Sequence, residues 1–129
     1  MENENSLIKD NWVGLALQDY KEGLGLLNEK SPHLVESFNH FTEECFNAGA
    51  LDAKTKQLMA LAIGVYANNE YCTIYHVKGA MDEGASEAEL LEAVGVAAAL
   101  GGGSAMAQGV TLVQDTIAEL QQRGDNAVH

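Results

Sequence analysis

The sequence LDAKTKQLMALAIGVYANNEYCTIYHVKGAMDEGASEAELLEAVGVAAALGGGSAM, residues 51–106, decides the fold. Its apolar residues recur every three or four positions and show no strand-like alternation, which predicts helices. Helix starts are marked by Asp52 and by Ser86, which forms an S-x-x-E capping box with Glu89. Gly84 is a suitable helix stop because glycine adopts the left-handed conformation at little cost. The stretch predicts three consecutive helices, over about residues 53–67, 70–83 and 87–100.

Helical signals continue on both sides of this stretch. Leucines spaced along residues 6–29 predict a first helix. Ser31 followed by Pro32 predicts the start of a second, since serine can cap free N–H groups and proline lacks the N–H that a first turn leaves unpaired. This second helix should end near Asn47, and a last helix should cover residues 104–123, ahead of a disordered end. We expect an all-α bundle of five or six helices in a single domain over the whole chain.

The apolar spacing also predicts which positions face the core. In the helix after Asp52 the predicted core positions are Leu58, Met59, Ala62, Ile63 and Val65. In the last helix they are Met106, Val110, Val113, Ile117 and Leu120. Alanine and aliphatic residues are so abundant over residues 53–100 that one chain has little polar surface to cover them. We therefore expect burial between subunits, and so a homo-oligomer.

Composition argues against several classes of partner. Hydrophobic residues make up 47% of the 129, yet no apolar run approaches the roughly 20 residues that span a bilayer. The net charge of −12 and the scattered Lys and Arg residues disfavour nucleic acid and anionic lipid surfaces. The first residues, MENENSLIKDNW, are acidic and polar, unlike a secretory signal. We expect a cytoplasmic protein that binds neither nucleic acid nor membranes.

The middle helix of the quoted stretch carries a thiol and an imidazole one turn apart. At i and i+4, Cys72 and His76 share a helix face, with about 6 Å between their Cβ atoms. The thiolate is the nucleophilic form of cysteine, and both a histidine base and a helix N-terminus favour it. The same spacing also arises by chance, and cysteine is among the most buried residue types. Spacing alone leaves both a reactive thiol and an inert pair open.

Other candidate sites are weaker. His33, His40 and Cys45 have the wrong spacing for a compact metal site, and no C-x-x-C or H-x-x-x-H pair occurs, so we expect no metal and no other cofactor. Cys45 is expected to be buried as a small hydrophobic residue, although it could serve as a resolving thiol. Tyr75 could donate a hydrogen bond to a substrate. The LGGGSAM sequence lacks the G-K-[ST] of a phosphate-binding loop, which favours an interhelical turn.

Taken together, these motifs resemble the carboxymuconolactone decarboxylase family, which includes the AhpD-like alkyl hydroperoxidases. The resemblance covers residues 49–120. It is carried by the K-[EQ]-L sequence at 56–58, the C-x-x-x-H of Cys72 and His76, the EGAS-E-E turn at 83–89 and the ALGGG break. It implies an all-α bundle that assembles as trimers or hexamers.

The thiol peroxidase branch of that family uses C-x-x-C-x-x-x-H, with a glutamate twelve residues before the first cysteine, for a proton relay and a reversible disulfide. Here Cys72 and His76 match the second cysteine and the histidine, whereas Asn69 and Gln57 replace the first cysteine and the glutamate. Asparagine cannot form the disulfide, and a neutral amide cannot accept the relay proton. The resemblance therefore implies a one-cysteine cycle on a small-molecule peroxide. An external thiol, or less readily Cys45, would regenerate Cys72.

Two other interpretations stay open. The lactone decarboxylase branch of the family relies on acid–base residues around a similar cavity, so His76 could act on a small cyclic acid without Cys72. Alternatively, the bundle is non-catalytic and serves to bind a small ligand or only to assemble. Thiol-dependent hydroperoxide reduction is the leading expectation.

Overall fold

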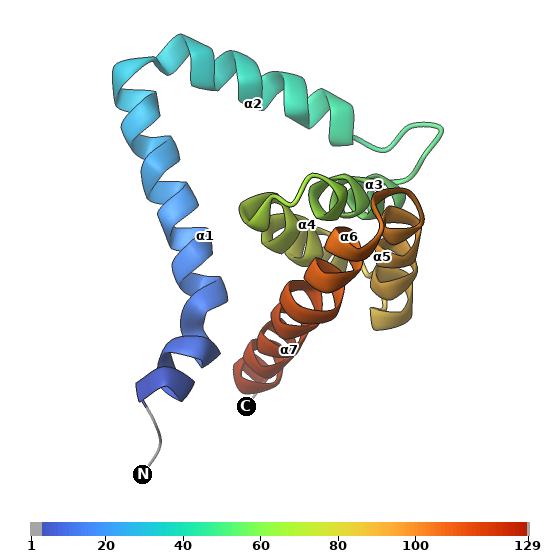
Figure 1. Ribbon diagram of the computed structural model, residues 1–129. Coiled ribbons are helices and arrows are strands. Elements are labelled where there is room, and N and C mark those ends of the chain that lie inside the picture. Colours follow the sequence, from blue (N-terminus) through green and yellow to red (C-terminus); the bar gives the residue numbers. More distant parts are fainter. Residues whose placement is uncertain (1–3, 129) are drawn as a thin grey trace.

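The computed structural model describes the backbone of residues 4–128 and the side chains of residues 12–124. All regular structure in this part of the chain is helical (Figure 1). The elements are α1 (Glu4–Lys30), α2 (Pro32–Phe46), α3 (Ala53–Tyr66), α4 (Glu70–Asp82), α5 (Glu87–Gly101), α6 (Gly103–Gln108), the π-helical turn η1 (Gly109–Val113) and α7 (Gln114–Val128). Because α6, η1 and α7 follow one another without a break, they form one continuous segment. The predicted all-α fold of five or six helices is confirmed.

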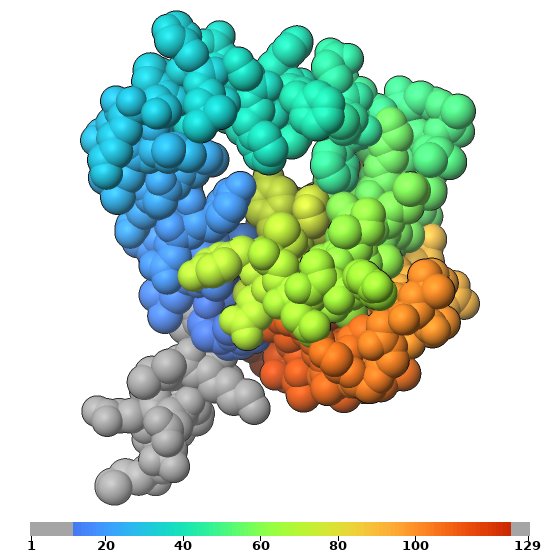
Figure 2. All heavy atoms as spheres, turned by 45° about the horizontal axis from the view of Figure 1, so that its top comes forward, coloured from blue at the N-terminus to red at the C-terminus, as the bar shows by residue number. Residues whose placement is uncertain are grey.

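The helices fall into a bundle and an arm. α3 to α7 pack together as the bundle, while α1 and α2, the arm, bend around one side of it (Figure 1). Figure 2 shows a hollow between the blue and cyan arm and the yellow-green part of the bundle. α1 packs against α4 and α7, whereas α2 carries a single buried residue among those described, Val35. None of the helices within residues 4–128 combines the length and the apolarity that crossing a membrane requires.

The main core lies inside the bundle and draws on every one of its helical segments. Its buried members are Leu61, Val65, Val77, Ala80, Leu90, Val94, Ala97, Ala105, Val113 and Ile117. A smaller cluster of Val13, Ile74 and Leu112 attaches α1 to α4 and η1. Both clusters include residues of α4, so this helix is held by the bundle and by the first part of the arm.

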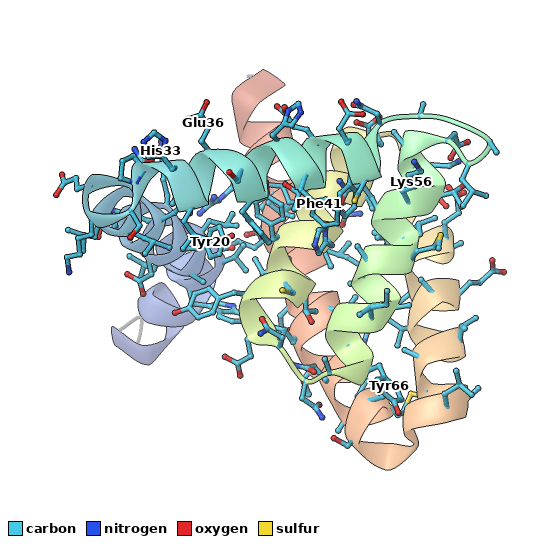
Figure 3. All side chains as sticks on the ribbon, turned by 90° about the horizontal axis from the view of Figure 1, so that it is seen from above. Tyr20, His33, Glu36, Phe41, Lys56 and Tyr66 are labelled. Carbon is cyan, nitrogen blue, oxygen red and sulfur yellow. The ribbon has the colours of Figure 1, made fainter. Side chains whose placement is uncertain are left out.

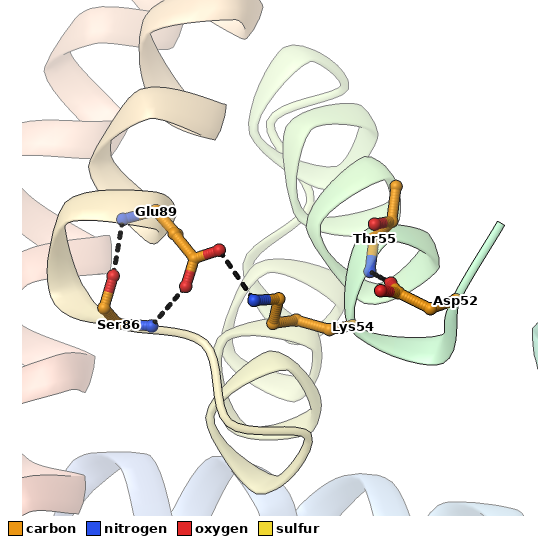
Figure 4. A network of polar contacts seen from close by, with 5 residues as sticks. All are labelled: Asp52, Lys54, Thr55, Ser86 and Glu89. Carbon is orange, nitrogen blue, oxygen red and sulfur yellow. Dashed lines mark hydrogen bonds and ion pairs between the residues drawn. The ribbon is translucent and has the colours of Figure 1, made fainter.

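Two predicted caps begin α3 and α5, and an ion pair joins them (Figure 4). The Asp52 carboxylate accepts a hydrogen bond from the backbone N–H of Thr55 at 2.7 Å. In the predicted capping box, Ser86 Oγ accepts from the N–H of Glu89 at 3.1 Å, and Glu89 Oε1 accepts from the N–H of Ser86 at 2.9 Å. Lys54 Nζ lies 2.9 Å from Glu89 Oε2, and this contact lowers the pKa of the Glu89 carboxyl. The starts of the two helices are thereby tied together.

One predicted cap and one predicted helix end differ from the structure. Pro32 begins α2 as predicted, but the side chain of Ser31 makes no capping hydrogen bond. Its backbone N–H instead donates to Leu27 O at 2.7 Å, so α1 passes almost directly into α2. The predicted disordered end is wrong for residues 124–128, because α7 continues through them, and His129 lies outside the described residues. Gly124 does not adopt the left-handed conformation that would stop a helix, whereas Gly84 does, with φ at 90°.

Part of the predicted core is exposed. Val113 and Ile117 are buried as predicted, but Met106 and Val110 are 46% and 51% exposed. The π-helical turn η1, which contains Val110 and Val113, inserts one extra residue and so rotates the helix beyond it by about 100° relative to the part before. An apolar spacing that runs across η1 therefore does not follow one face. In α3, Met59 and Ile63 are also exposed, because the apolar positions of this helix extend beyond the face that the bundle covers.

Gly109 of η1 packs directly against Val94 of α5, where an added Cβ would overlap Val94 Cγ1. A buried, branched valine has little freedom to move away. Gly109→Ala is therefore expected to lower the free energy of unfolding by about 1–3 kcal/mol, although alanine favours a helix more than glycine does.

The matched control is Gly95→Ala in α5, where an added Cβ meets nothing within 4 Å. It should raise the free energy of unfolding by about 0.5–1 kcal/mol. Urea unfolding of both variants measures the difference. Equal stability of the two would contradict the close packing of η1 on α5.

Candidate functional site

Cys72, Tyr75 and His76 lie on the side of α4 that faces the arm. They open on a cavity of about 340 Å³, the thiol cavity, which Gln57 of α3 also lines. The arm supplies the opposite wall, including Tyr20 of α1 and Phe46 of α2. The site is therefore built by four helices, two from the bundle and two from the arm.

Cys72 occupies the first turn of α4, three residues after the N-cap residue Asn69. The Asn69 side-chain oxygen accepts a hydrogen bond from the Cys72 backbone N–H at 2.9 Å. The Asn69 backbone oxygen accepts a second from Thr73 Oγ1 at 2.8 Å. The thiol is free and exposed, and the helix N-terminus beside it favours negative charge. Asn69 thus holds the backbone of Cys72 in place. It occupies the position at which the peroxidases that this chain resembles carry the first cysteine of their C-x-x-C pair.

The His76 imidazole is held by a hydrogen bond and by two aromatic rings. Its Nδ1 lies 2.9 Å from Gln57 Oε1. An amide oxygen only accepts, so Nδ1 carries the proton and Nε2 is the unprotonated nitrogen of the neutral ring. The Phe46 ring stacks on the imidazole with 5.5 Å between centroids, and Tyr75 meets it edge-on at 5.3 Å. Burial lowers the pKa of His76, so the ring is neutral at neutral pH.

Gly79 makes room for the contact between Gln57 and His76. A Cβ at this position would overlap Gln57 Oε1, the atom that accepts the imidazole N–H. A side chain at position 79 would therefore occupy the place of the amide. The glycine allows α3 and α4 to approach closely enough for the hydrogen bond to form.

The structure brings the predicted site residues together without a direct bond between thiol and imidazole. Gln57, Cys72, Tyr75 and His76 all line the thiol cavity, and Asn69 is hydrogen-bonded to Cys72. Among the hydrogen bonds of the described residues, none joins Cys72 to His76, whose Nδ1 is engaged by Gln57. A proton passing from the thiol to Nε2 must therefore cross part of the cavity.

The remaining cysteine and two histidines on α2 lie elsewhere. The expected burial of Cys45 is wrong: it is exposed, because α2 packs only lightly on the bundle, and it is not among the residues that line the thiol cavity. His33 and His40 are exposed on the same helix, and Figure 3 shows His33 and Glu36 pointing away from the bundle. Over the residues that the structure describes, no group of three or more His, Cys, Asp or Glu could hold a metal ion.

The arm residues of the cavity are absent from the sequence prediction. Tyr20 and Leu24 of α1 are one turn apart, as are Asn39 and Glu43 of α2, and each pair shares a helix face. This spacing is visible in the sequence, but nothing local indicates that the arm bends back over α4. Glu43 in particular places a carboxylate in the cavity.

Gly79→Ala should displace the Gln57 amide from His76 without unfolding α4. The amide is the end of a flexible side chain and can move, and alanine in a helix interior is favoured over glycine by about 0.5–1 kcal/mol. Without an acceptor opposite Nδ1, the proton loses its preference for that nitrogen. The nitrogen chemical shifts of the His76 ring, measured by NMR, should change accordingly, while Gly95→Ala leaves them as in the parent. Unchanged shifts in a folded Gly79→Ala variant would contradict the role given to this glycine.

Comparison with known proteins agrees with the resemblance seen in the sequence. A sequence model of the carboxymuconolactone decarboxylase family matches residues 32–115. Uncharacterized protein 4 in the cox locus of Paracoccus denitrificans is 37% identical over 93 residues, which cover 72% of this chain and 84% of that protein.

Two solved structures share the fold. A carboxymuconolactone decarboxylase family protein from Legionella pneumophila, crystallised in its apo form, matches with a TM-score of 0.80 and 26% identity over 84% of this chain and 97% of that one. A family protein from Thermotoga maritima, with a possible involvement in an antioxidative response, matches with a TM-score of 0.76 and 25% identity over 86% and 94% of the two chains. The chain therefore belongs to the carboxymuconolactone decarboxylase family.

Proposed function

We propose that this protein reduces hydroperoxides, with Cys72 as the reactive thiol and His76 as its proton partner. One observation carries the proposal: an exposed thiol at the start of α4 shares a cavity with a neutral histidine whose free nitrogen is Nε2. The possible antioxidative involvement of the Thermotoga relative is consistent with it.

The oxidation step begins when the thiol loses its proton. Nε2 of His76 takes up this proton, directly or through a water molecule, and the N-terminal end of α4 stabilises the thiolate. The sulfur then attacks the terminal oxygen of R–O–O–H, and the O–O bond breaks. Sulfur is oxidised by two electrons to the sulfenic acid, and the alkoxide takes the proton back from His76 and leaves as R–OH.

Regeneration requires an external thiol. Asn69 cannot form the disulfide, and Cys45 does not line the thiol cavity. One thiol molecule condenses with the sulfenic acid, releasing water and leaving a mixed disulfide on Cys72. A second attacks that disulfide, restores the Cys72 thiol and leaves as the oxidised dimer of the reductant. A cytoplasmic location, where small thiols are kept reduced, suits this cycle and stays a prediction.

In this scheme Gln57 positions His76 and carries no proton. Its amide oxygen accepts from Nδ1, which directs the unprotonated Nε2 toward the reaction. Because the amide cannot accept the proton itself, the proton that His76 takes up returns to the leaving alkoxide. The family relay is thereby shortened to one proton carrier.

The acid–base interpretation is less well supported by the cavity. Glu43 does line the same cavity as His76, and general acid–base chemistry could use its carboxylate. However, no Lys or Arg occurs among the described residues that line the thiol cavity, so nothing there would neutralise the carboxylate of a small cyclic acid.

Peroxide treatment followed by a sulfenic-acid probe should label Cys72 and not Cys45, as read by peptide mass spectrometry. Cys72→Ser should abolish labelling and peroxide consumption, whereas Cys45→Ser, the control at the other exposed cysteine, keeps both. His76→Ala should slow Cys72 oxidation by roughly 10²–10⁴-fold at neutral pH, because the proton acceptor is lost.

Other outcomes would assign other roles. Turnover of a cyclic acid that survives Cys72→Ser and disappears in His76→Ala would support the acid–base interpretation. An unlabelled Cys72 together with no turnover would point to a non-catalytic protein.

We also propose that the protein assembles from copies of its own chain. The large exposed apolar residues of α3, α5 and α6–η1, here called the bundle face, are Met59, Ile63, Tyr66, Leu91, Val96, Leu100, Met106 and Val110. Ile63 is 65% exposed and Leu100 80%. Four of them, Met59, Ile63, Met106 and Val110, have the sequence spacing of core residues, yet they are exposed in the single chain. Figure 3 shows Tyr66 at the end of the bundle remote from α2, so contacts there leave the thiol cavity open.

Light scattering after gel filtration should give the wild-type protein a mass that is a multiple of 13.8 kDa, as a trimer or hexamer would have. A double variant, Ile63→Asp with Leu100→Asp, should shift toward the single-chain mass, since a buried unpaired charge is costly. Leu26→Asp, at a site on α1 that is 57% exposed and outside the bundle face, is the control and should leave the mass unchanged. A wild-type mass of one chain would exclude the assembly.

A further inference from the structure

A second and larger cavity lies within the arm, next to the thiol cavity. This arm cavity encloses about 550 Å³ and is lined by residues of α1 and α2 together with Tyr71 of α4. Most of its described lining is aliphatic or aromatic, and Asp19 is the one charged member. Its volume falls within the range of small-molecule sites, about 300–1,000 Å³.

The two cavities adjoin. Tyr20, Leu24, Phe38 and Tyr71 line both of them. The Tyr20 ring lies between them, with its centroid 6.5 Å from that of Tyr71 and 5.9 Å from that of Tyr75. Figure 3 shows Tyr20 in the space enclosed by α1, α2 and α4. A molecule that reacts at Cys72 can therefore extend past these rings into the arm.

We propose that the arm cavity is a binding site for an uncharged, apolar group of the molecule that reacts at Cys72, with position 23 of α1 controlling its size. This inference rests on the proposed function. The preferred substrate is then an organic hydroperoxide whose apolar group fills the arm cavity, rather than hydrogen peroxide, which has no such group.

The charges around the two cavities select against an anion. Asp19 lines the arm cavity and Glu43 the thiol cavity, and neither cavity has a Lys or Arg among its described lining residues. The whole chain carries a net charge of −12. Within these two cavities a negatively charged substrate would meet Asp19 and Glu43 without a Lys or Arg partner, whereas an apolar group gains from leaving water.

Gly23 offers a way to block the arm cavity alone. It lines the arm cavity and is absent from the thiol cavity, and a Cβ added to it meets nothing within 4 Å. Gly25 lies two residues further along the same helix, lines neither cavity and is equally free of contacts. Both glycines lie outside residues 32–115, the part that the family model matches. Comparing the same substitution at Gly23 and at Gly25 therefore distinguishes the effect of filling the arm cavity from the effect of placing a larger residue in α1.

The test compares Gly23→Phe with Gly25→Phe. Cumyl alcohol, the uncharged product of cumene hydroperoxide reduction, is titrated into each protein and followed by two-dimensional NMR. Gly23→Phe should weaken its binding about tenfold or more, the effect of losing a well-filled apolar contact, while Gly25→Phe binds it like the wild type. Phenylacetate, of similar size but charged, should bind the wild type more weakly than the alcohol does.

A second, kinetic experiment measures how fast cumene hydroperoxide and hydrogen peroxide oxidise Cys72. The ratio of the two rate constants should fall about tenfold in Gly23→Phe and stay unchanged in Gly25→Phe, because only the first variant fills the arm cavity.

The two proposals can fail separately. If cumyl alcohol binds in the Gly23-dependent manner while no hydroperoxide oxidises Cys72, the arm cavity is a ligand site and the peroxidase function is wrong. If Cys72 is oxidised but the alcohol does not bind, or if the two variants behave alike, the arm-cavity inference is overturned. Equal binding of phenylacetate and the alcohol would overturn the selection for uncharged groups.

Discussion

The site depends on α4 burying one side in the bundle while its other side stays open to the arm. Thr73, Ile74, Val77 and Ala80 are buried. On the adjoining side, Cys72 is exposed at the start of the helix and His76 follows one turn later, half-buried. Because successive residues of an α-helix differ by about 100° in direction, a rotation by one residue would carry the thiol toward the core and a core residue into the cavity. The packing of the buried residues therefore fixes the direction in which Cys72 and His76 point.

Two substitutions that remove the family relay have clear structural roles in this chain. Asn69 has no thiol, but it caps α4 by accepting the N–H of Cys72. Asparagine is among the best N-cap residues, so this position contributes to the stability of the turn that carries the thiol. Gln57 cannot take up the relay proton as a glutamate would, but its amide oxygen accepts from Nδ1 of His76 and leaves Nε2 unprotonated. In the proposed function the chemistry rests on one sulfur and one imidazole, supported by these two neutral polar side chains.

The features that could be predicted from the sequence are those that depend on interactions between residues a few positions apart. The caps at Asp52 and Ser86 connect residues three apart, so their signals are contained in a few letters. The face shared by Cys72 and His76 follows from helix geometry alone. The exposure of Met106 could not be predicted in this way, because the π-helical turn η1 that follows it breaks the apolar spacing and has no local sequence signal. The wall of the thiol cavity formed by α1 and α2 could not be predicted either, since it depends on how these two helices are placed relative to the bundle.

The arm is attached near its two ends, and between them the Tyr20 ring contacts Tyr71 and Tyr75 of α4. Val13 anchors α1 in the cluster with Ile74 and Leu112, and at the other end Lys56 Nζ donates to Asn47 O at 2.6 Å, close to where Phe46 stacks on His76. Between these attachments α1 and α2 enclose space instead of packing tightly on the bundle. The bundle therefore carries Cys72 and His76, while the arm supplies the opposite wall of the thiol cavity. Under the proposed function these two tasks fall to different helices, so residues of α1 could change the fit of a substrate without disturbing the thiol or the imidazole, and selectivity could diverge within one fold while the chemistry stays the same.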